Sequence, residues 1–220
     1  TTREVTVTIE DKTSVYGDAL KELTSSVTEG TVIEGDDLGI ALTKAEGTTV
    51  GEYAITGTAS NTNYNVTFVN GTYTITTREV TVTIDNKTSV YGEDLKELTS
   101  NVTEGTVVEG DDLGIVLTKA EGKDAGEYAI TGTASNTNYN VTFVDGTYTI
   151  TTREVTVTID NKTSVYGEDL KELTSNVTEG TVIEGDDLGI ALTKAEGTTV
   201  GEYAITGTAS NTNYDVTFVE

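Results

Sequence analysis

The sequence contains no histidine, cysteine, methionine, tryptophan or proline. Without histidine there is no imidazole base or imidazole metal ligand, and without cysteine there is no thiolate, disulfide or zinc knuckle. These absences disfavour the chemistry that most hydrolases and transferases use near neutral pH. We therefore expect a protein that is not an enzyme and that carries no cofactor, with Ca²⁺ as the one ion worth testing.

Positive charge is also scarce, because 13 lysines and arginines stand against 37 acidic residues, a net charge of −24 at pH 7. Such a surface repels nucleic-acid phosphates and anionic lipids, so we expect no nucleic-acid partner. No apolar run approaches the roughly 20 residues that span a bilayer, which predicts no membrane insertion. The chain begins with Thr1 instead of methionine and has no signal peptide, so we expect a fragment of a longer protein.

The chain consists of internal repeats. The string TTREVTVTI starts at Thr1, at Thr76 and again at Thr151, 75 residues apart each time. A unit of this length exceeds a solenoid repeat and fits a small domain. We expect three tandem domains, 1–75, 76–150 and 151–220, arranged as an elongated rod and monomeric. The third stops five residues short of the others and should lack its final strand.

Alternating apolar residues predict β-strands in each repeat. Between Arg3 and Ile9, the side chains of Val5, Val7 and Ile9 share one face. Asp18–Leu23 is the only helix-like stretch. We expect a mainly β fold, sandwich-like and with α+β as the alternative, that has at most one short helix per repeat. The other strands are expected at 13–16, 23–27, 31–33, 38–44, 51–59 and on both sides of 70–71.

Two Gly-containing pairs predict tight turns. Glu29-Gly30 separates two short strands, and Asn70-Gly71 stands between alternating apolar runs. Asn-Gly in that setting is the strongest short-range signal for a β-hairpin, and repeat two offers Asp145-Gly146 in the same place.

Consecutive repeats are joined without a linker rich in glycine or serine. The buried set changes parity across the joint, from Tyr73 and Ile75 to Val80 and its successors. This predicts either a continuous strand with neighbouring repeats rotated by about half a turn, or a bulge near Thr76–Arg78. Arg3, Arg78 and Arg153 open the repeats, and two interpretations stay open: pairing with an acid of the neighbouring repeat, or plain solvation.

Acidic residues are the only abundant titratable groups. Glu34-Gly35-Asp36-Asp37 is expected to be a turn, and its adjacent acids are candidate Ca²⁺ ligands, although we favour solvated carboxylates with no metal. The full set of metal candidates is Asp36, Asp37, Asp111, Asp112, Asp186 and Asp187. An acid pair acting as a glycosidase dyad is a weaker hypothesis.

Tyrosines supply most of the large side chains. Most of the rings of Tyr16, Tyr53, Tyr64 and Tyr73 are expected in the core, because each repeat has only Phe68 or its equivalent as a further aromatic. Tyr64 is the best candidate for a ring at the rim whose hydroxyl anchors a loop. Tyr64, with Asn61 and Asn63, is the candidate ligand platform. An intramolecular isopeptide bond is a further hypothesis; its candidate residues are Lys12, Lys21, Lys44, Asn61 and Asn63.

Five motifs in a fixed order carry a family resemblance. They are Val15–Asp18, Glu34–Leu38, Val50–Ile55, Asn63–Phe68 and Gly71–Ile75. The unit resembles the MBG domain of the YGX type, a repeat of large bacterial surface proteins and adhesins, and more distantly the YDG-type repeat. One departure is Ala19–Glu22, where relatives often carry a proline-containing stretch.

The resemblance implies β-rich modules in stalks and no catalytic residues. We expect acidic tandem repeats of a secreted adhesin that serve as a stalk or spacer at the bacterial cell surface. Such a stalk is anchored in the cell wall or membrane through other regions and projects a distal domain for cell adhesion. The partners are neighbouring repeats, with host glycan or protein bound by other domains. The alternative is a repeated adhesin module that itself binds host glycan or protein.

Overall fold

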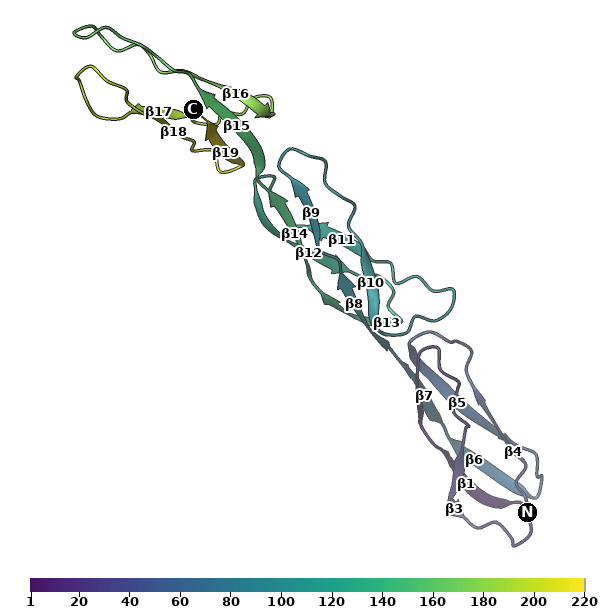
Figure 1. The fold of residues 1–220 in the computed structure, drawn as a ribbon. Helices are drawn as coiled ribbons and strands as arrows, with labels where there is room; N and C mark the ends of the chain where they lie inside the picture. The colour runs from purple at the N-terminus through teal and green to yellow at the C-terminus, as the bar shows by residue number, and fades with distance from the viewer. Residues whose placement is uncertain (220) are drawn as a thin grey trace. The chain divides into compact units, whose positions relative to one another are not determined.

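The computed structural model describes residues 1–219, in which there are nineteen β-strands and no helix (Figure 1). The prediction of a mainly β fold is confirmed. Residue 220, the last of the third predicted repeat, lies outside the described residues. None of the described elements is a helix that could span a membrane.

The described chain divides into two compact units. The first contains residues 1–83, 101–116 and 133–144, and the second contains 84–100, 117–132 and the described residues from 145 onward. The first unit therefore holds repeat one and one sheet of repeat two, and the second unit holds the other sheet of repeat two and repeat three. Each unit contains one complete contact between consecutive repeats.

Repeat one forms two small sheets. The first has the order β3 (Ser25–Gly30), β1 (Arg3–Ile9), β6 (Tyr64–Val69). The second has the order β2 (Lys12–Val15), β7 (Gly71–Thr76), β5 (Gly51–Ala59), β4 (Ile40–Lys44). Strand β1 pairs antiparallel with β3 and parallel with β6, and β2 pairs parallel with β7.

Repeat two has the same two sheets. They are β10 (Ser100–Gly105), β8 (Arg78–Ile84), β13 (Tyr139–Val144), and β11 (Val116–Lys119), β12 (Gly126–Thr133), β14 (Gly146–Thr151), β9 (Lys87–Val90). Repeat three has β16 (Ser175–Gly180), β15 (Arg153–Ile159), β19 (Tyr214–Val219), and a two-stranded sheet of β17 (Ala191–Lys194) and β18 (Ile205–Thr208). With two strands in this second sheet, Ile205 is half-buried, whereas its counterparts Ile55 and Ile130 are fully buried.

The core of repeat one forms two clusters on the apolar face of β1. Val5 and Val7 pack with Leu38 and Tyr64. Ile9, at the end of the same strand, packs in a second cluster with Ile55, Tyr73 and Ile75. The predicted alternation along 3–9 is thus confirmed. Every second side chain of β1 points into the core, so the strand reaches one cluster with Val5 and Val7 and the other with Ile9.

The predicted helix over Asp18–Leu23 is wrong. After the turn at Gly17 the chain is irregular until β3. The amide of Lys21 donates to the hydroxyl of Tyr73 at 2.7 Å, so it is not available for a helical bond to a carbonyl four residues back. Leu20 is 53% exposed, which shows that the Leu20/Leu23 spacing does not describe a buried helical face.

The predicted hairpin at Asn70-Gly71 is also wrong. Strands β6 and β7, on either side of it, belong to different sheets. A two-residue I′ turn needs positive φ at both central residues, and neither Asn70 nor Gly71 has it. Glycine is required here for another reason: an added Cβ at Gly71 would lie 2.8 Å from the carbonyl oxygen of Ile9. The Asn-Gly pair is a crossing between sheets that passes close to the backbone after β1.

The turn expected at Glu29-Gly30 does not form, because β3 runs through both residues. Gly30 pairs with Val5 at a φ of 78°, next to a register shift between Thr6 and Val7. An added Cβ at Gly30 would lie 2.4 Å from the carbonyl oxygen of Glu4. The glycine therefore permits a bulged strand end, and 31–33 is not a strand.

The strand between repeats is interrupted at a single residue. Strand β7 ends at Thr76, β8 begins at Arg78, and Thr77 lies outside both. Thr152 occupies the same position between β14 and β15. The break lies where the apolar pattern changes parity, in the segment Thr76–Arg78 where a bulge was one of the two alternatives, and it lets the chain pass from one sheet to the next. The strand is therefore not continuous across the joint.

We predict that Gly71→Ala lowers the free energy of unfolding of repeat one by about 1–3 kcal/mol, because the new methyl group meets the backbone carbonyls of Ile9 and Glu10. Calorimetry on the full chain measures the change. Gly201→Ala is the matched control, since its Cβ has only ordinary contacts with Tyr203. Equal effects of the two substitutions would contradict the close-approach explanation.

Candidate functional site: the contact between consecutive repeats

The two predicted metal candidates of repeat one bond within their own repeat. The amide of Asp36 donates to the carbonyl of Ile33 at 2.9 Å, and Gly35, the third residue of this turn, has a φ of 90°. Together these two features define a type II turn. The carboxylate of Asp36 accepts the hydroxyl of Tyr64 at 2.7 Å, and that of Asp37 accepts the amide of Gly39 at 2.8 Å. The expected turn is confirmed, and its acids serve as hydrogen-bond acceptors.

The other four metal candidates repeat this pattern. Asp111 accepts from Tyr139 at 2.6 Å and Asp186 from Tyr214 at 2.6 Å. Asp112 and Asp187 each accept the amide two residues later at 2.8 Å. Over residues 1–219 no three or more acidic side chains form a group that could hold a metal ion.

The three ligand candidates lie beside this acidic turn. The side-chain amide of Asn61 donates to the carbonyl of Asp37 at 2.8 Å, and its oxygen accepts the amide of Asn63 at 3.1 Å. Tyr64 is buried, with 6% of its surface exposed, and its hydroxyl also accepts the amide of Ile33 at 2.9 Å. The structure thus brings Asp36, Asn61 and Tyr64 together as a set of bonds that holds two loops in place.

Two of the three lysines of the isopeptide hypothesis, Lys12 and Lys44, have other partners for their amines. The amine of Lys44 donates to the carbonyls of Ala45 and Gly47 at 2.8 and 2.6 Å and lies 3.9 Å from the centre of the Tyr53 ring. The amine of Lys12 pairs with Glu10 at 3.0 Å. These contacts explain the positions of both amines without a covalent cross-link.

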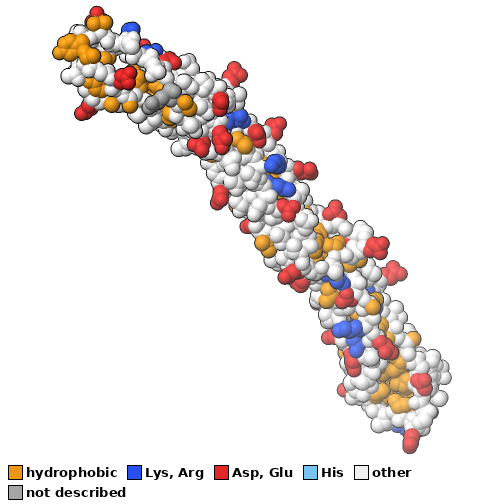
Figure 2. Space-filling view, in the orientation of Figure 1, with side chains coloured by type: hydrophobic (Ala, Val, Ile, Leu, Met, Phe, Trp, Pro, Cys, Tyr) orange, Lys and Arg blue, Asp and Glu red, His pale blue; other side chains and the backbone are white. Residues whose placement is uncertain are grey.

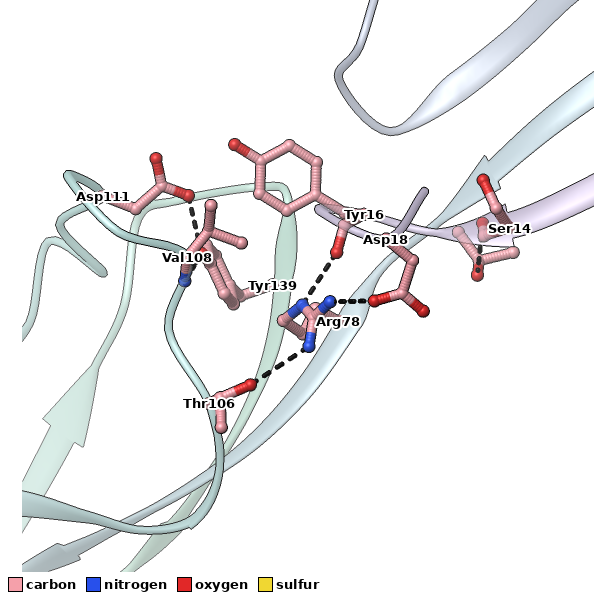
Figure 3. A network of polar contacts seen from close by, with 9 residues as sticks. Ser14, Tyr16, Asp18, Arg78, Thr106, Val108, Asp111 and Tyr139 are labelled. Carbon is pink, nitrogen blue, oxygen red and sulfur yellow. Dashed lines mark hydrogen bonds and ion pairs between the residues drawn. The ribbon is translucent and has the colours of Figure 1, made fainter. Parts of the chain in front are cut away.

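Arg78 connects repeat one to repeat two (Figure 3). Its Nε donates to the carbonyl of Tyr16 at 2.7 Å, and one terminal nitrogen pairs with Asp18. The other terminal nitrogen donates to Thr106 at 3.1 Å. The planar guanidinium therefore joins a turn of repeat one to a loop of repeat two, and of the two open interpretations, pairing with an acid of the neighbouring repeat is confirmed for Arg78.

The turn that Arg78 binds also makes an apolar contact. Gly17 has a φ of 81°, and an added Cβ there would lie 2.3 Å from a methyl carbon of Val108. Gly92 and Ile183 repeat this arrangement in the next contact, at 2.5 Å. Gly167, the third copy, has nothing within 4 Å of the same point. Glycine is needed in the first two copies both for the turn and for the close packing.

Tyrosine rings pack at each contact. Tyr16 meets Tyr139 edge to face, with ring centres 5.6 Å apart, and Tyr91 meets Tyr214 in the same way at 5.6 Å. The hydroxyl of Tyr91 also donates to Asp186 at 3.0 Å. Tyr166, the third copy of Tyr16, is 74% exposed, so burial of this ring depends on the repeat that follows.

A backbone bond completes each contact. The amide of Val50 donates to the side-chain oxygen of Asn138 at 3.0 Å, and the amide of Ala125 donates to Asn213 at 2.8 Å. Asn138 and Asn213 are the counterparts of the ligand candidate Asn63. In these two copies the position expected to bind a ligand instead accepts a backbone amide of the preceding repeat.

The second contact repeats two of the three bonds that the arginine makes in the first. Arg153 donates to the carbonyl of Tyr91 at 2.8 Å and to Thr181 at 3.1 Å. The residues that the sequence analysis missed are Thr106, Val108 and Val50. The sequence pattern that could have predicted the contact has two parts. They are the Tyr-Gly-acid motif of one repeat and the arginine that opens the next repeat.

The negative charge of Asp186 acts on both tyrosines of the second contact. Hydrogen bonding to Asp186 raises the pKa of Tyr91 above its usual value. Burial raises the pKa of Tyr214, and Asp186 adds to the effect. In both cases the neutral phenol is favoured in the folded protein, because a phenolate would face the carboxylate.

A comparison with protein families finds one family whose model matches three successive segments, which together make up most of the chain. The model of the MBG domain (YGX type) matches residues 5–74, 80–149 and 155–220. No curated protein matches the chain. The match confirms the resemblance stated from the five motifs.

We predict that stability falls at alkaline pH through this tyrosine pair. A pKa raised in the folded state gives stability that is fully present below about pH 10 and is lost as the pH rises through the raised value. Tyr91→Phe should make the alkaline loss of stability shallower, as measured by denaturant unfolding at a series of pH values. Tyr166→Phe, at the exposed third copy, should leave the slope unchanged, and a change of the same size there would contradict the assignment.

We predict that Arg78→Ala uncouples repeats one and two. Loss of a charged donor with three partners should lower the free energy of unfolding of the flanking sheets by about 1–3 kcal/mol and separate their calorimetric transitions. Arg3→Ala is the control, because the guanidinium of Arg3 contacts Thr31 of its own repeat. Indistinguishable transitions in the two variants would show that the guanidinium does not couple the repeats.

Proposed function

Because this chain belongs to the MBG domain family of the YGX type, we propose that it is a structural stalk or spacer of a secreted bacterial surface protein. Repeats of this family are typical of surface proteins. In the proposal the array lies outside the cell and is anchored in the wall or membrane through other regions. It holds a distal adhesive domain away from the cell and has no catalytic role.

The observation that carries the proposal is the duplicated contact between repeats. One residue separates the last strand of each repeat from the first strand of the next. The glycine, tyrosine and asparagine contacts then recur at both boundaries, as do the bonds from the arginine to a tyrosine carbonyl and to a threonine. A spacer needs a fixed geometry at every boundary, and a short connection with a built contact supports that role better than a flexible linker does.

The charge of the chain supports the same role. Acidic side chains are scattered over the visible face without a single dense cluster (Figure 2). A net charge of −24 gives mutual repulsion between chains that are displayed at high density. The proposal therefore treats the protein as a monomer whose partners are the neighbouring repeats.

The direct-binding alternative has less support. It depends on Asn61, Asn63 and Tyr64, and the Asn61 side chain and the Tyr64 hydroxyl already bond within their own repeat. The counterparts of Asn63 bind the preceding repeat. A glycan array with chains of one, two and three repeats distinguishes the two roles, since an adhesive module gives a signal that rises steeply with repeat number.

We predict that small-angle scattering shows an extended particle. Its distribution of interatomic distances should widen only when the arginines at the boundaries between repeats are removed. Arg78→Ala combined with Arg153→Ala should widen the distribution of interatomic distances, whereas Arg3→Ala should leave it unchanged. The same measurement with Ca²⁺ and with a chelator tests the acidic turns. A compact unmodified chain, or extension only with Ca²⁺, would overturn the proposal of a stiff, metal-independent stalk.

A further inference from the structure

We infer that the repeat is a mechanical clamp, in which the parallel pair of its first and sixth strands resists tension along the chain. The inference deepens the proposed function, which supplies the physiological load, but its geometry depends only on the topology of the repeat. Its test reads the unfolding force, and it is therefore independent of the scattering experiment above.

The first element of the clamp is the β1–β6 pair. The two strands are parallel over six residue pairs, from Arg3 with Tyr64 to Thr8 with Val69. The chain enters the repeat at the Arg3 end of β1 and leaves β6 at the Val69 end. Because parallel strands point the same way, these two points lie at opposite ends of the pair. Tension from the two chain directions therefore loads all the interstrand bonds together, in shear.

The second element is the β2–β7 pair. These strands are parallel over four residue pairs, from Lys12 with Tyr73 to Val15 with Thr76. Strand β2 is held at its Lys12 end by the short connection from β1, and β7 is pulled at its Thr76 end toward the next repeat. This pair is again loaded from opposite ends. Strand β7 also pairs along its other edge with β5, so it is bonded on both sides.

Packing protects the loaded bonds from water. Val5 and Val7 of β1 are 3% and 0% exposed, and they pack against buried Tyr64 at the entry end of β6. Across the pair, the side-chain amide of Asn65 donates to Glu4 at 2.7 Å. Near the crossing between sheets, the amide of Thr72 donates to Asp11 at 2.7 Å. These contacts must also break before the strands slide.

The connection between repeats passes the load directly to the next clamp. Thr77 is the single residue between β7, which is pulled from repeat one, and β8, which is the first strand of repeat two. There is thus no slack segment to extend at low force before the parallel pairs are loaded.

The three repeats form an internal comparison. Repeat two has both parallel pairs, β8 with β13 over six residue pairs and β9 with β14 over four. Repeat three has the β15–β19 pair over six residue pairs, but its second sheet contains only the antiparallel strands β17 and β18. The described part of repeat three therefore holds one of the two elements.

Single-molecule pulling on the full chain from its two ends tests the clamp. We expect three unfolding events, two at a similar high force and one, from repeat three, at a lower force. Each high-force event should release roughly 250–270 Å of chain, less the length of the folded repeat, because a repeat has 75 residues and each extends about 3.3–3.6 Å. Three events at equal force would show that the β2–β7 pair and its counterpart in repeat two add nothing to the unfolding force.

A second pulling geometry tests the direction of the load. The chain has no cysteine, so Thr2→Cys and Asn63→Cys provide two unique attachment points at the same end of β1 and β6. Force applied between them peels the strands apart one bond at a time, and repeat one should open at a several-fold lower force. Equal forces in the two geometries would overturn the clamp, while the scattering result would still decide the stalk.

Discussion

Buried phenols with bonded hydroxyl groups are the interaction on which each repeat depends. A unit with so few large apolar side chains fills its two clusters with Tyr64 and Tyr73. Each ring is packed in the core while its hydroxyl reaches the backbone of a loop, at Ile33 and at Lys21. Since these loops have no helix or sheet to satisfy their amides, the tyrosines supply both apolar burial and the missing acceptors.

The contact between repeats is built from the same parts. The Tyr139 ring fills part of the core of repeat two, with its hydroxyl on Asp111, and it also makes an edge-to-face contact with Tyr16 of repeat one. The same residue thus stabilises the core of its own repeat and contacts the repeat before it. Exposed Ile33, with counterparts Val108 and Ile183 that are half-buried under a glycine, illustrates how the same position changes environment when a neighbour is present.

Local patterns in the sequence predicted the strands at 3–9 and 51–59 because their periodicity is set by which face is buried. The hairpin predicted at Asn70-Gly71 was wrong, because the Asn-Gly pair reflects only a local preference for a turn. It cannot show that the carbonyl of Ile9 lies against Gly71. The acidic turn was identified, but its role was not, because Asp111 is close to Tyr16 only through the fold. Non-local approach is the part that a single sequence does not contain.

The single residue between strands also affects how the array meets proteases. Proteolytic enzymes cut segments that can be drawn out into an extended, accessible stretch, which is why linkers between domains are usually nicked first. Here Thr77 is flanked directly by β7 and β8, and the one basic residue at that boundary, Arg78, is engaged by Tyr16, Asp18 and Thr106. A trypsin-like enzyme therefore finds no cleavable linker there, and digestion at the boundary requires a strand to detach first.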